Sequence, residues 1–292
     1  MKFIVRHHLN HFFHISRKSG NYRNFPSQHT LFKMDIYFFK YQGTGNDFVI
    51  LDNRNKKYDF LSREQVSFLC DRRFGIGADG LMMLNLKAGY DFEMKYYNAD
   101  GNESSMCGNG GRCLVKFAYH CGMLKSTFNF SATDGDHLAE IYGEEVSLKM
   151  KDVDIIQNYH GDAVLDTGSP HYVKIETDVV NLDVLVKGRE IRYSHHFAEK
   201  GINVNFVERK DEDEIIVRTY ERGVEAETLS CGTGVTASAL VCYHNESGFN
   251  NVVVTTKGGE LSVEFDRTND GSYHNIWLSG AAVKVFEGTI QI

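Results

Sequence analysis

From residue 34 onwards, hydrophobic and polar positions alternate in short runs that are separated by glycine turns. The runs MDIYFFKYQ (34–42) and FVILD (48–52) flank the turn GTGND (43–47), and DFEMKYYNADG (91–101) and VSLKM (146–150) follow the same pattern. Such alternation predicts half-buried β-strands. Within LSREQVSFLC, Ser62 and Gln65 have the spacing of a capping box, which predicts that a helix begins there.

The second pattern is an internal repeat. Residues 103–120 (ESSMCGNGGRCLVKFAYH) and 227–244 (ETLSCGTGVTASALVCYH) align without a gap at an offset of 124. The identical pairs are Glu103/Glu227, Cys107/Cys231, Gly108/Gly232, Gly110/Gly234, Tyr119/Tyr243 and His120/His244. Further matches at offsets between 123 and 126 are TGND with TGSPHYV, FGIGADG with KGINVNF, KYYNADG with RTYERGV, and TDGD with TKGG. The chain is therefore predicted to be a duplicated unit.

The repeat predicts an α+β fold with two pseudo-symmetric domains. We expect each domain to be a strongly curved, mostly antiparallel sheet around a central helix, because VTASALVCY (235–243) is apolar on nearly every face. The expected domains are residues 34–153 and 154–280, with a closing strand over 281–292 that returns to the first domain. The active site is expected in the cleft between the domains, at the two helix N-termini.

Each repeat places a cysteine on a tight glycine turn that opens directly into a helix. Unpaired N–H groups and the helix dipole at Cys107 and Cys231 are expected to lower the thiol pKa and to bind a carboxylate. Two such turns facing each other would hold one carboxylate between two sulfurs, which suits removal of a proton from a carbon acid on one face and its replacement on the other. GIGADG (75–80) lacks the third glycine of a dinucleotide motif, and nothing resembles a pyridoxal phosphate site, so no cofactor is expected. The other cysteines are interpreted as small buried apolar residues: Cys70, Cys113, Cys121 and Cys242.

Composition and charge narrow the function class. The net charge is −7, and residues 1–33 hold six Lys/Arg and no acidic residue, so the rest carries 26 basic against 39 acidic residues. A body this acidic argues against nucleic-acid binding, and no apolar run is long enough for a membrane span. Six cysteines without paired spacing indicate reduced thiols in the cytoplasm, and the spacing of Cys107 and Cys113 does not match a zinc site. The oligomeric state is left open, and a homodimer is compatible with the sequence.

Residues 1–33 are interpreted as an extension outside the fold, with Met34 as the alternative start. A transit segment is the other interpretation, because the stretch is Arg-rich and acid-poor, but serine is sparse and the amphipathic pattern is weak. Removal of residues 1–33 is expected to leave activity and melting temperature nearly unchanged.

Residues 34–292 resemble the diaminopimelate epimerase family. The motifs that carry the resemblance are GTGNDFVILDN, NADG before CGNGGRC, GINVNFVE, YERG and ETLSCGTG, all in family order. The resemblance implies two similar domains that close over LL- or meso-diaminopimelate, with Cys107 and Cys231 as the acid/base pair and no cofactor. It implies that His171 and Glu221 lie near the cysteines and that Arg222 meets the distal carboxylate. The other implied substrate-binding positions are the backbone amides of Gly108, Asn109, Gly232 and Thr233, together with Asn46, Asn98, Asn203 and Glu221.

Three positions depart from the family pattern. Ser169 stands where many members have Asn, and Asp79 stands where some members have a substrate-binding Gln, so that role is not transferred. The run ERGVEAET (221–228) is one residue longer than the usual ERGxGET, which could shift Glu221 relative to Cys231.

Structural interpretations compete with several of these roles. Glu103 and Glu227 could cap or charge their helix starts, and His120 and His244 lie some three turns down their helices and are expected to be structural. Asn46, Asn98 and Asn203 could instead stabilise turns, where asparagine is common. A proline or hydroxyproline racemase is the alternative enzyme, although a monocarboxylate needs no distal guanidinium. A thiol redox or carboxylate-binding protein is the non-enzymatic alternative, and it predicts a disulfide between Cys107 and Cys231.

Overall fold

The computed structural model describes residues 34–245 and 247–292, and Met34–Ile292 forms one compact unit. The predicted extension over residues 1–33 lies outside the described residues. The elements up to residue 149 are β1 (Asp35–Gly43), β2 (Asn46–Asp52), α1 (Arg63–Cys70), β3 (Gly80–Asn85), β4 (Phe92–Asn98), β5 (Glu103–Ser104), α2 (Gly108–His120), β6 (Thr127–Ala132), β7 (Gly135–Tyr142) and β8 (Glu145–Lys149).

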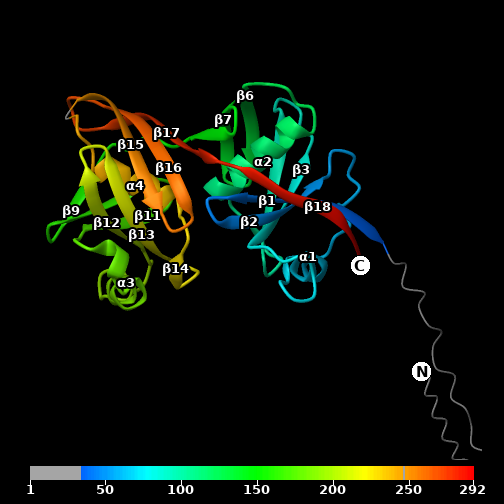
Figure 1. The fold of residues 1–292 in the computed structure, drawn as a ribbon, viewed down its shortest axis with the longest axis horizontal. Coiled ribbons are helices and arrows are strands. Elements are labelled where there is room, and N and C mark those ends of the chain that lie inside the picture. Colours follow the sequence, from blue (N-terminus) through cyan, green and yellow to red (C-terminus); the bar gives the residue numbers. More distant parts are fainter. Residues whose placement is uncertain (1–33, 246) are drawn as a thin grey trace, which may run out of the picture. The chain divides into compact units, whose positions relative to one another are not determined.

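The later elements are β9 (Gln157–Tyr159), β10 (Asp162–Asp166), β11 (Pro170–Ile175), the 3-10 helix η1 (Val179–Asn181), α3 (Val184–Arg192), β12 (Asn203–Asp211), β13 (Glu214–Glu221), β14 (Ala226–Thr228), α4 (Gly232–Val241), β15 (Gly248–Thr256), β16 (Gly259–Arg267), β17 (Tyr273–Ala281) and β18 (Val283–Gln291). From β10 to β17 they repeat the order of β1 to β8, with η1 inserted before α3. Figure 1 shows the two sets of elements.

Strand pairing shows the duplication directly. In the first domain β18 pairs with β1 and β1 with β2, both antiparallel, and β2 is parallel to β3. In the second domain β9, β10, β11 and β12 repeat these pairings in the same order. Parallel β4–β6 corresponds to parallel β13–β15, and antiparallel β8–β17 joins the two sets. The predicted α+β class with two duplicated, mostly antiparallel domains is confirmed, whereas the boundary between residues 153 and 154 stays a prediction.

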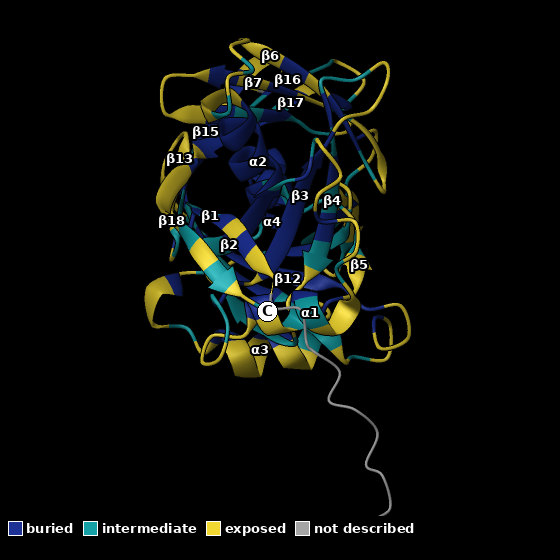
Figure 2. Ribbon diagram, turned by 90° about the vertical axis from the view of Figure 1, so that its right-hand side faces the viewer, coloured by how far each residue is buried: buried dark blue, intermediate teal, exposed yellow. Residues whose placement is uncertain are grey.

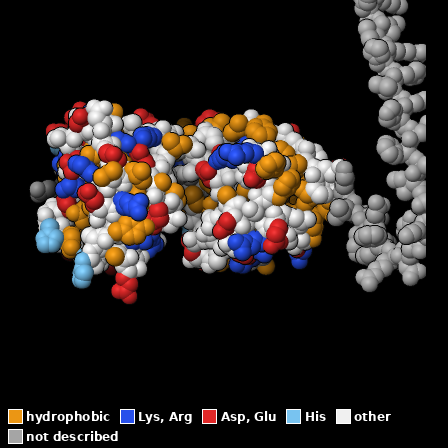
Figure 3. Space-filling model, turned by 90° about the horizontal axis from the view of Figure 1, so that it is seen from below, with side chains coloured by type: hydrophobic (Ala, Val, Ile, Leu, Met, Phe, Trp, Pro, Cys, Tyr) orange, Lys and Arg blue, Asp and Glu red, His pale blue; other side chains and the backbone are white. Residues whose placement is uncertain are grey.

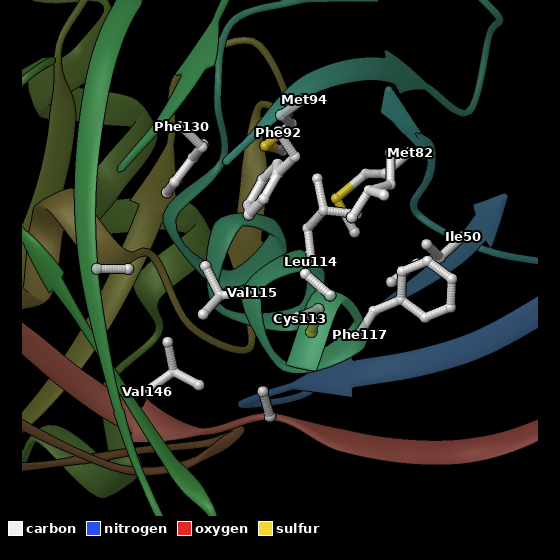
Figure 4. Packing of buried hydrophobic residues seen from close by; sticks show 14 of the residues in the cluster. Ile50, Met82, Phe92, Met94, Cys113, Leu114, Val115, Phe117, Phe130 and Val146 are labelled. Atoms are coloured by element: carbon white, nitrogen blue, oxygen red, sulfur yellow. The ribbon is translucent and has the colours of Figure 1, made fainter. Parts of the chain in front are cut away.

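One helix in each domain is buried inside its sheet. Leu114, Val115 and Phe117 of α2 have no exposed surface, and the same holds for Val235 and Leu240 of α4. Both helices are dark blue in Figure 2. The neighbours of α2 that Figure 4 labels come from the surrounding strands and are Ile50, Met82, Phe92, Met94, Phe130 and Val146. Burial of each such side chain contributes about 1.5–3 kcal/mol to folding, so these helices fix where the cysteine turns at their N-termini lie.

The other helix of each domain packs on the outer face of the sheet. Ser62 caps α1 and Gln65 completes the capping box, as the sequence predicts. Val66 and Leu69 of α1 pack against Val49 and Leu51. In the second domain Val184 of α3 lies in the corresponding cluster with residues of β12 and β13. Each sheet therefore has a helix on both faces.

The surface carries mixed charge. On the face in Figure 3, acidic and basic side chains are interspersed with hydrophobic ones. No helix in the described ranges is long and apolar enough to cross a membrane. The predicted absence of nucleic-acid binding stays a prediction.

Candidate active site

The two cysteines of the repeat occupy equivalent positions at helix starts. Cys107 is the N-cap of α2 and Cys231 is the N-cap of α4, both with extended backbones (φ −95° and −123°). Neither side chain forms a cap hydrogen bond to its own helix. Both residues are partly exposed, and both are free thiols. The predicted turn-to-helix geometry is therefore present at both positions.

The two helix N-termini face each other. A Cβ atom built on Gly108 would lie 3.9 Å from Cα of Gly232, and one built on Gly232 would lie 3.8 Å from Cα of Gly108. Leu278 of β17 lies beneath both turns, since its Cδ2 atom would be 3.7 Å and 2.9 Å from those Cβ atoms. The first glycine of each CGxG turn thus allows the two domains to approach, and the N–H groups of both helices meet at one place.

The second glycine of each turn serves its own domain. A Cβ on Gly110 would lie 3.1 Å from the sulfur of Met82, and one on Gly234 would collide with the side chain of Asn205. The first glycine of CGxG therefore faces the opposite domain, and the second packs against side chains of its own domain.

The pKa of each thiol moves opposite to the prediction. Burial raises the pKa of both thiols, and the carboxylate of Glu221 adds to the rise, while backbone N–H groups of α2 and α4 oppose it only in part. The pKa of Cys231 rises to about 12, and a charge on Cys107 contributes to that shift. The helix-terminus effect was predicted with the right sign, but loss of solvent outweighs it. Both shifts favour the neutral thiol over the thiolate.

His171 reaches Cys231 through a hydroxyl group. Its Nδ1 atom accepts from the amide of Asn205 (3.1 Å), so Nε2 carries the hydrogen and donates to Oγ1 of Thr233 (2.9 Å). The Thr233 hydroxyl can then donate to Sγ of Cys231 at 3.5 Å. Burial lowers the pKa of His171 to about 3, which keeps the ring neutral. His171 is thus a fixed donor in a line that ends at the sulfur.

Glu221 ends β13 and acts on both cysteines. Burial raises its pKa, a smaller contribution from the Asp79 carboxylate adds to that, and the hydroxyl of Thr228 opposes it. Its charge raises the pKa of Cys107 and of Cys231. Glu221 thus acts electrostatically on both thiols, and the catalytic role that the resemblance implies for it stays a prediction.

Asn109 links the first domain to the second and also binds Asn46 of its own domain. Nδ2 of Asn109 donates to Oδ1 of Asn46 at 2.6 Å and to the carbonyl of Ser230 at 3.4 Å. Nδ2 of Asn46 donates to Asp79 at 2.9 Å. Asp79 also pairs with Arg72 at 2.7 Å, so it orients Asn46.

Asn203, Arg222 and Ser169 form a second polar cluster next to Glu221. Nδ2 of Asn203 donates to Oγ of Ser169 (2.9 Å), while its Oδ1 accepts from the backbone N–H of Arg222 (2.8 Å). The Arg222 guanidinium donates to Ser169 (3.4 Å) and to the carbonyl of Lys200 (3.1 Å). Where many members of the resembled family have an Asn side chain, Ser169 supplies a hydroxyl that contacts both Asn203 and Arg222.

Glu225 anchors the longer loop. Its carboxylate accepts from the hydroxyls of Tyr193 (3.0 Å) and Tyr220 (3.1 Å) and from the N–H of Gly223 (3.1 Å), and it pairs with Arg192 at 3.3 Å. Its backbone is left-handed, with φ of 56°. The loop that carries Glu221 and Arg222 is thereby attached to the end of α3.

The remaining candidates make no side-chain hydrogen bond to these clusters within the described part of the chain. Asn98 is exposed at the end of β4, opposite Gly80, and its side chain has no hydrogen-bond partner among the described residues. Glu227 does not cap its helix, since it pairs with Arg218 (2.6 Å) and Lys257 (2.7 Å). Glu103 contacts Thr133, His120 contacts Tyr41, and His244 contacts Glu212.

Sequence reasoning missed three supporting residues. They are Arg112, which donates to Oδ1 of Asn109 (2.9 Å), Asn205 and Leu278. Asn205 is two residues from Asn203 on β12 and so lies on the same face of the strand, a spacing that could have identified it. Leu278 gave no signal. No group of three or more His, Cys, Asp or Glu side chains within the described ranges is arranged to bind a metal ion.

Comparison with known proteins gives consistent matches. The family model described as diaminopimelate epimerase matches residues 38–156 and 163–285. A diaminopimelate epimerase of Flavobacterium psychrophilum is 46% identical over 254 residues, covering 86% of this chain and 99% of the relative. One from Aquifex aeolicus is 39% identical over 275 residues, covering 87% and 97%.

Solved structures share the fold at low identity. A PhzF-family phenazine biosynthesis protein of Bacillus anthracis has a TM-score of 0.66 at 16% identity, covering 89% of this chain and all of that one. A hydroxyproline epimerase from Agrobacterium vitis has a TM-score of 0.61 at 12% identity, covering 88% and 93%. At these identities the likeness concerns the fold alone.

Proposed function

Because the chain belongs to the diaminopimelate epimerase family, we propose that it interconverts LL- and meso-2,6-diaminopimelate, a step in lysine and peptidoglycan synthesis. The observation that supports the chemistry is that Cys107 and Cys231 cap two helices whose N-termini meet at Gly108 and Gly232. The reaction needs no external cofactor in this proposal.

Inversion requires one proton to leave and another to arrive on the opposite face. The thiolate of one cysteine takes the Cα proton and becomes a thiol, while the thiol of the other gives its proton to the carbanion and becomes a thiolate. Atoms and charge balance, and the enzyme is left with the protonation states of Cys107 and Cys231 exchanged. The reverse reaction starts from that exchanged state.

The carboxylate next to the reacting carbon is proposed to bind at the two helix starts. The backbone N–H groups of Gly108, Asn109, Gly232 and Thr233 lie in the first turns of α2 and α4. Unpaired N–H groups and the positive ends of both helix dipoles favour an anion there. The same groups stabilise the charge that develops on the carboxylate as the carbanion forms.

Ionisation of a thiol must accompany substrate binding, because both free thiols have a raised pKa. The substrate brings a cationic amino group to the carbon between the sulfurs, and a nearby positive charge lowers a thiol pKa. This restricts the reactive thiolate to the bound state.

Distal recognition supports a dicarboxylate substrate. Arg222 and Asn203 share Ser169, beside the Glu221 that acts on both sulfurs. A guanidinium in this place suits a second carboxylate. A proline racemase would not use that group, and a redox protein would need the two sulfurs bonded rather than separated by a substrate carbon.

Incubation of reduced enzyme with LL-diaminopimelate in deuterated water tests the proposal. We expect inversion at one centre with one deuterium at that Cα, and loss of turnover in Cys107→Ser and in Cys231→Ser. Arg222→Ala should raise KM or relax selectivity instead. Turnover of proline but not of diaminopimelate would favour the racemase, and full activity in either cysteine variant would rule out the two-thiol mechanism.

A further inference from the structure

Arg112 is a fully buried cation next to the Cys107 turn. It lies in α2, five residues after Cys107, with 0% of its surface exposed. Its Nη2 atom donates to Oγ1 of Thr44 at 2.7 Å and to Oδ1 of Asn109 at 2.9 Å, whereas Nε and Nη1 have no hydrogen-bond partner among the described residues. Within those residues no carboxylate pairs with it. Gly280 of β17 covers it, since a Cβ there would lie 3.4 Å from Nε.

A buried guanidinium without a counter-ion is a poor source of stability. Removing a charge from water carries a large free-energy penalty, and replacement of buried ionic groups by apolar ones of similar volume is often neutral or stabilising. The position of Arg112 therefore needs an explanation other than packing, and its hydrogen bonds provide one.

The bond to Arg112 fixes which way the amide of Asn109 points. Because Oδ1 accepts from the guanidinium, Nδ2 must face Oδ1 of Asn46 (2.6 Å) and the carbonyl of Ser230 (3.4 Å). If the amide were reversed, its oxygen would face two other oxygens, and its NH2 group would face a cation. Only one orientation is compatible with these partners.

The donor fixed in this way crosses between the domains. Ser230 directly precedes Cys231, and Asn109 follows Cys107 by two residues, so the bond ties one cysteine turn to the other. The same guanidinium holds Thr44, whose φ is 50°, in the turn that leads to Asn46. We propose that Arg112 is a positioning residue that sets the separation of the Cys107 and Cys231 turns through the amide of Asn109. The proposed geometric role is independent of the proposed function, and only the expected change in kcat rests on it.

The test compares Arg112→Met, which keeps length without charge, with Arg112→Lys and Asn109→Ala in the full chain. Dibromobimane, a short cross-linker for two thiols, is applied to the reduced enzyme without substrate, and mass spectrometry quantifies the Cys107–Cys231 product. We expect Arg112→Met to melt near the wild-type temperature, to cross-link more slowly, and to lose about ten- to a hundredfold in kcat, as a small misplacement of reacting groups does. Arg112→Lys should be intermediate.

Coupling separates this role from a general structural one. If Arg112 acts through Asn109, the double variant Arg112→Met/Asn109→Ala should be no worse than Asn109→Ala alone. Additive losses, or wild-type cross-linking in Arg112→Met, would overturn the proposal. Cross-linking needs no substrate, so absence of epimerase activity in the wild type would refute the proposed function without affecting this result.

Asn109→Asp keeps the test decisive if Arg112→Met does not fold. The carboxylate that this substitution introduces can still accept from Arg112, but its second oxygen faces Oδ1 of Asn46 and the carbonyl of Ser230. The proposal expects a folded protein with slow cross-linking and low kcat. An Asn109→Asp variant that behaves like the wild type would contradict it.

Discussion

Phe48 and His171 occupy equivalent positions in the two domains, and they give the two cysteine turns different surroundings. Phe48 pairs with Gly80 across parallel β2–β3, and His171 pairs with Asn203 across parallel β11–β12. A Cβ on Gly110 would lie 3.5 Å from the Phe48 ring, and one on Gly234 would lie 3.3 Å from the His171 ring. The duplicated fold therefore presents an apolar ring beside one turn and a hydrogen-bonding ring beside the other.

This asymmetry predicts that Thr233 tunes only one thiol. The Thr233 hydroxyl lowers the pKa of Cys231, so Thr233→Val should raise that pKa further and leave His171 without its acceptor. We expect slower alkylation of Cys231 at a given pH and a loss of about 1–3 kcal/mol in unfolding free energy. The pH dependence of iodoacetamide labelling, resolved by peptide mass spectrometry, measures the shift. Thr233→Ser keeps the hydroxyl and serves as the control, and an equal shift at Cys107 would contradict the assignment.

The charge of Glu221 predicts a shift at both thiols. Since burial and also the Glu221 carboxylate raise the pKa of Cys107 and Cys231, Glu221→Gln should lower both values. A raised thiol pKa means that the thiolate fraction grows as pH increases, so labelling of the free wild-type enzyme should accelerate well above pH 7. In Glu221→Gln the same acceleration should begin at lower pH. Unchanged labelling profiles would show that Glu221 does not act on the sulfurs electrostatically.

The position of Leu278 predicts that Gly232→Ala destabilises the fold more than Gly108→Ala. Gly232→Ala would bring a methyl group to 2.9 Å from the fully buried Leu278 side chain, whereas Gly108→Ala leaves 3.7 Å. We expect Gly232→Ala to lower the free energy of unfolding by about 1–3 kcal/mol, as overpacking does, and Gly108→Ala to change it much less. Thermal denaturation of the two variants measures this difference. Gly232→Ala in combination with Leu278→Val should recover part of the loss, and failure to do so would mean that another contact is responsible.

Much of the fold was predictable because the residues that define the repeat act over short distances along the chain. Glycines at turns, alternation in strands and the capping box of Ser62 act within a few residues, so they identify β1, α1, α2 and α4 directly. Alternation does not state which strand is the partner. The pairing of β18 with β1 agrees with the expected closing strand, but it depends on closure of the whole domain rather than on any local signal.

The site was less predictable, because its properties arise between distant residues. The direction of the thiol pKa shift was wrong, since burial raises the pKa of Cys107 and Cys231, and burial depends on how the whole chain packs rather than on the local turn. The link between Asn109 and Ser230 spans 121 residues and leaves no periodic trace in the sequence. A resemblance between sequences can suggest such residues, but not the contacts that orient them.

The longer loop of this chain gives the last prediction, which concerns Glu225. Its left-handed backbone costs about 1–2 kcal/mol for a residue with a side chain, and the contacts of its carboxylate with Arg192, Tyr193, Tyr220 and Gly223 offset that cost. Glu225→Gly removes the strain together with the contacts, so the melting temperature should change little. Arg222, which directly follows β13 and begins this loop, should then be held less firmly. We therefore expect KM for diaminopimelate to rise several-fold with a smaller effect on kcat.

Glu225→Gln keeps neutral hydrogen bonds, loses the ion pair with Arg192, and should be intermediate. Steady-state kinetics and amide hydrogen exchange over residues 221–226 measure both effects, and unchanged KM and exchange in Glu225→Gly would show that the loop holds its shape without this carboxylate.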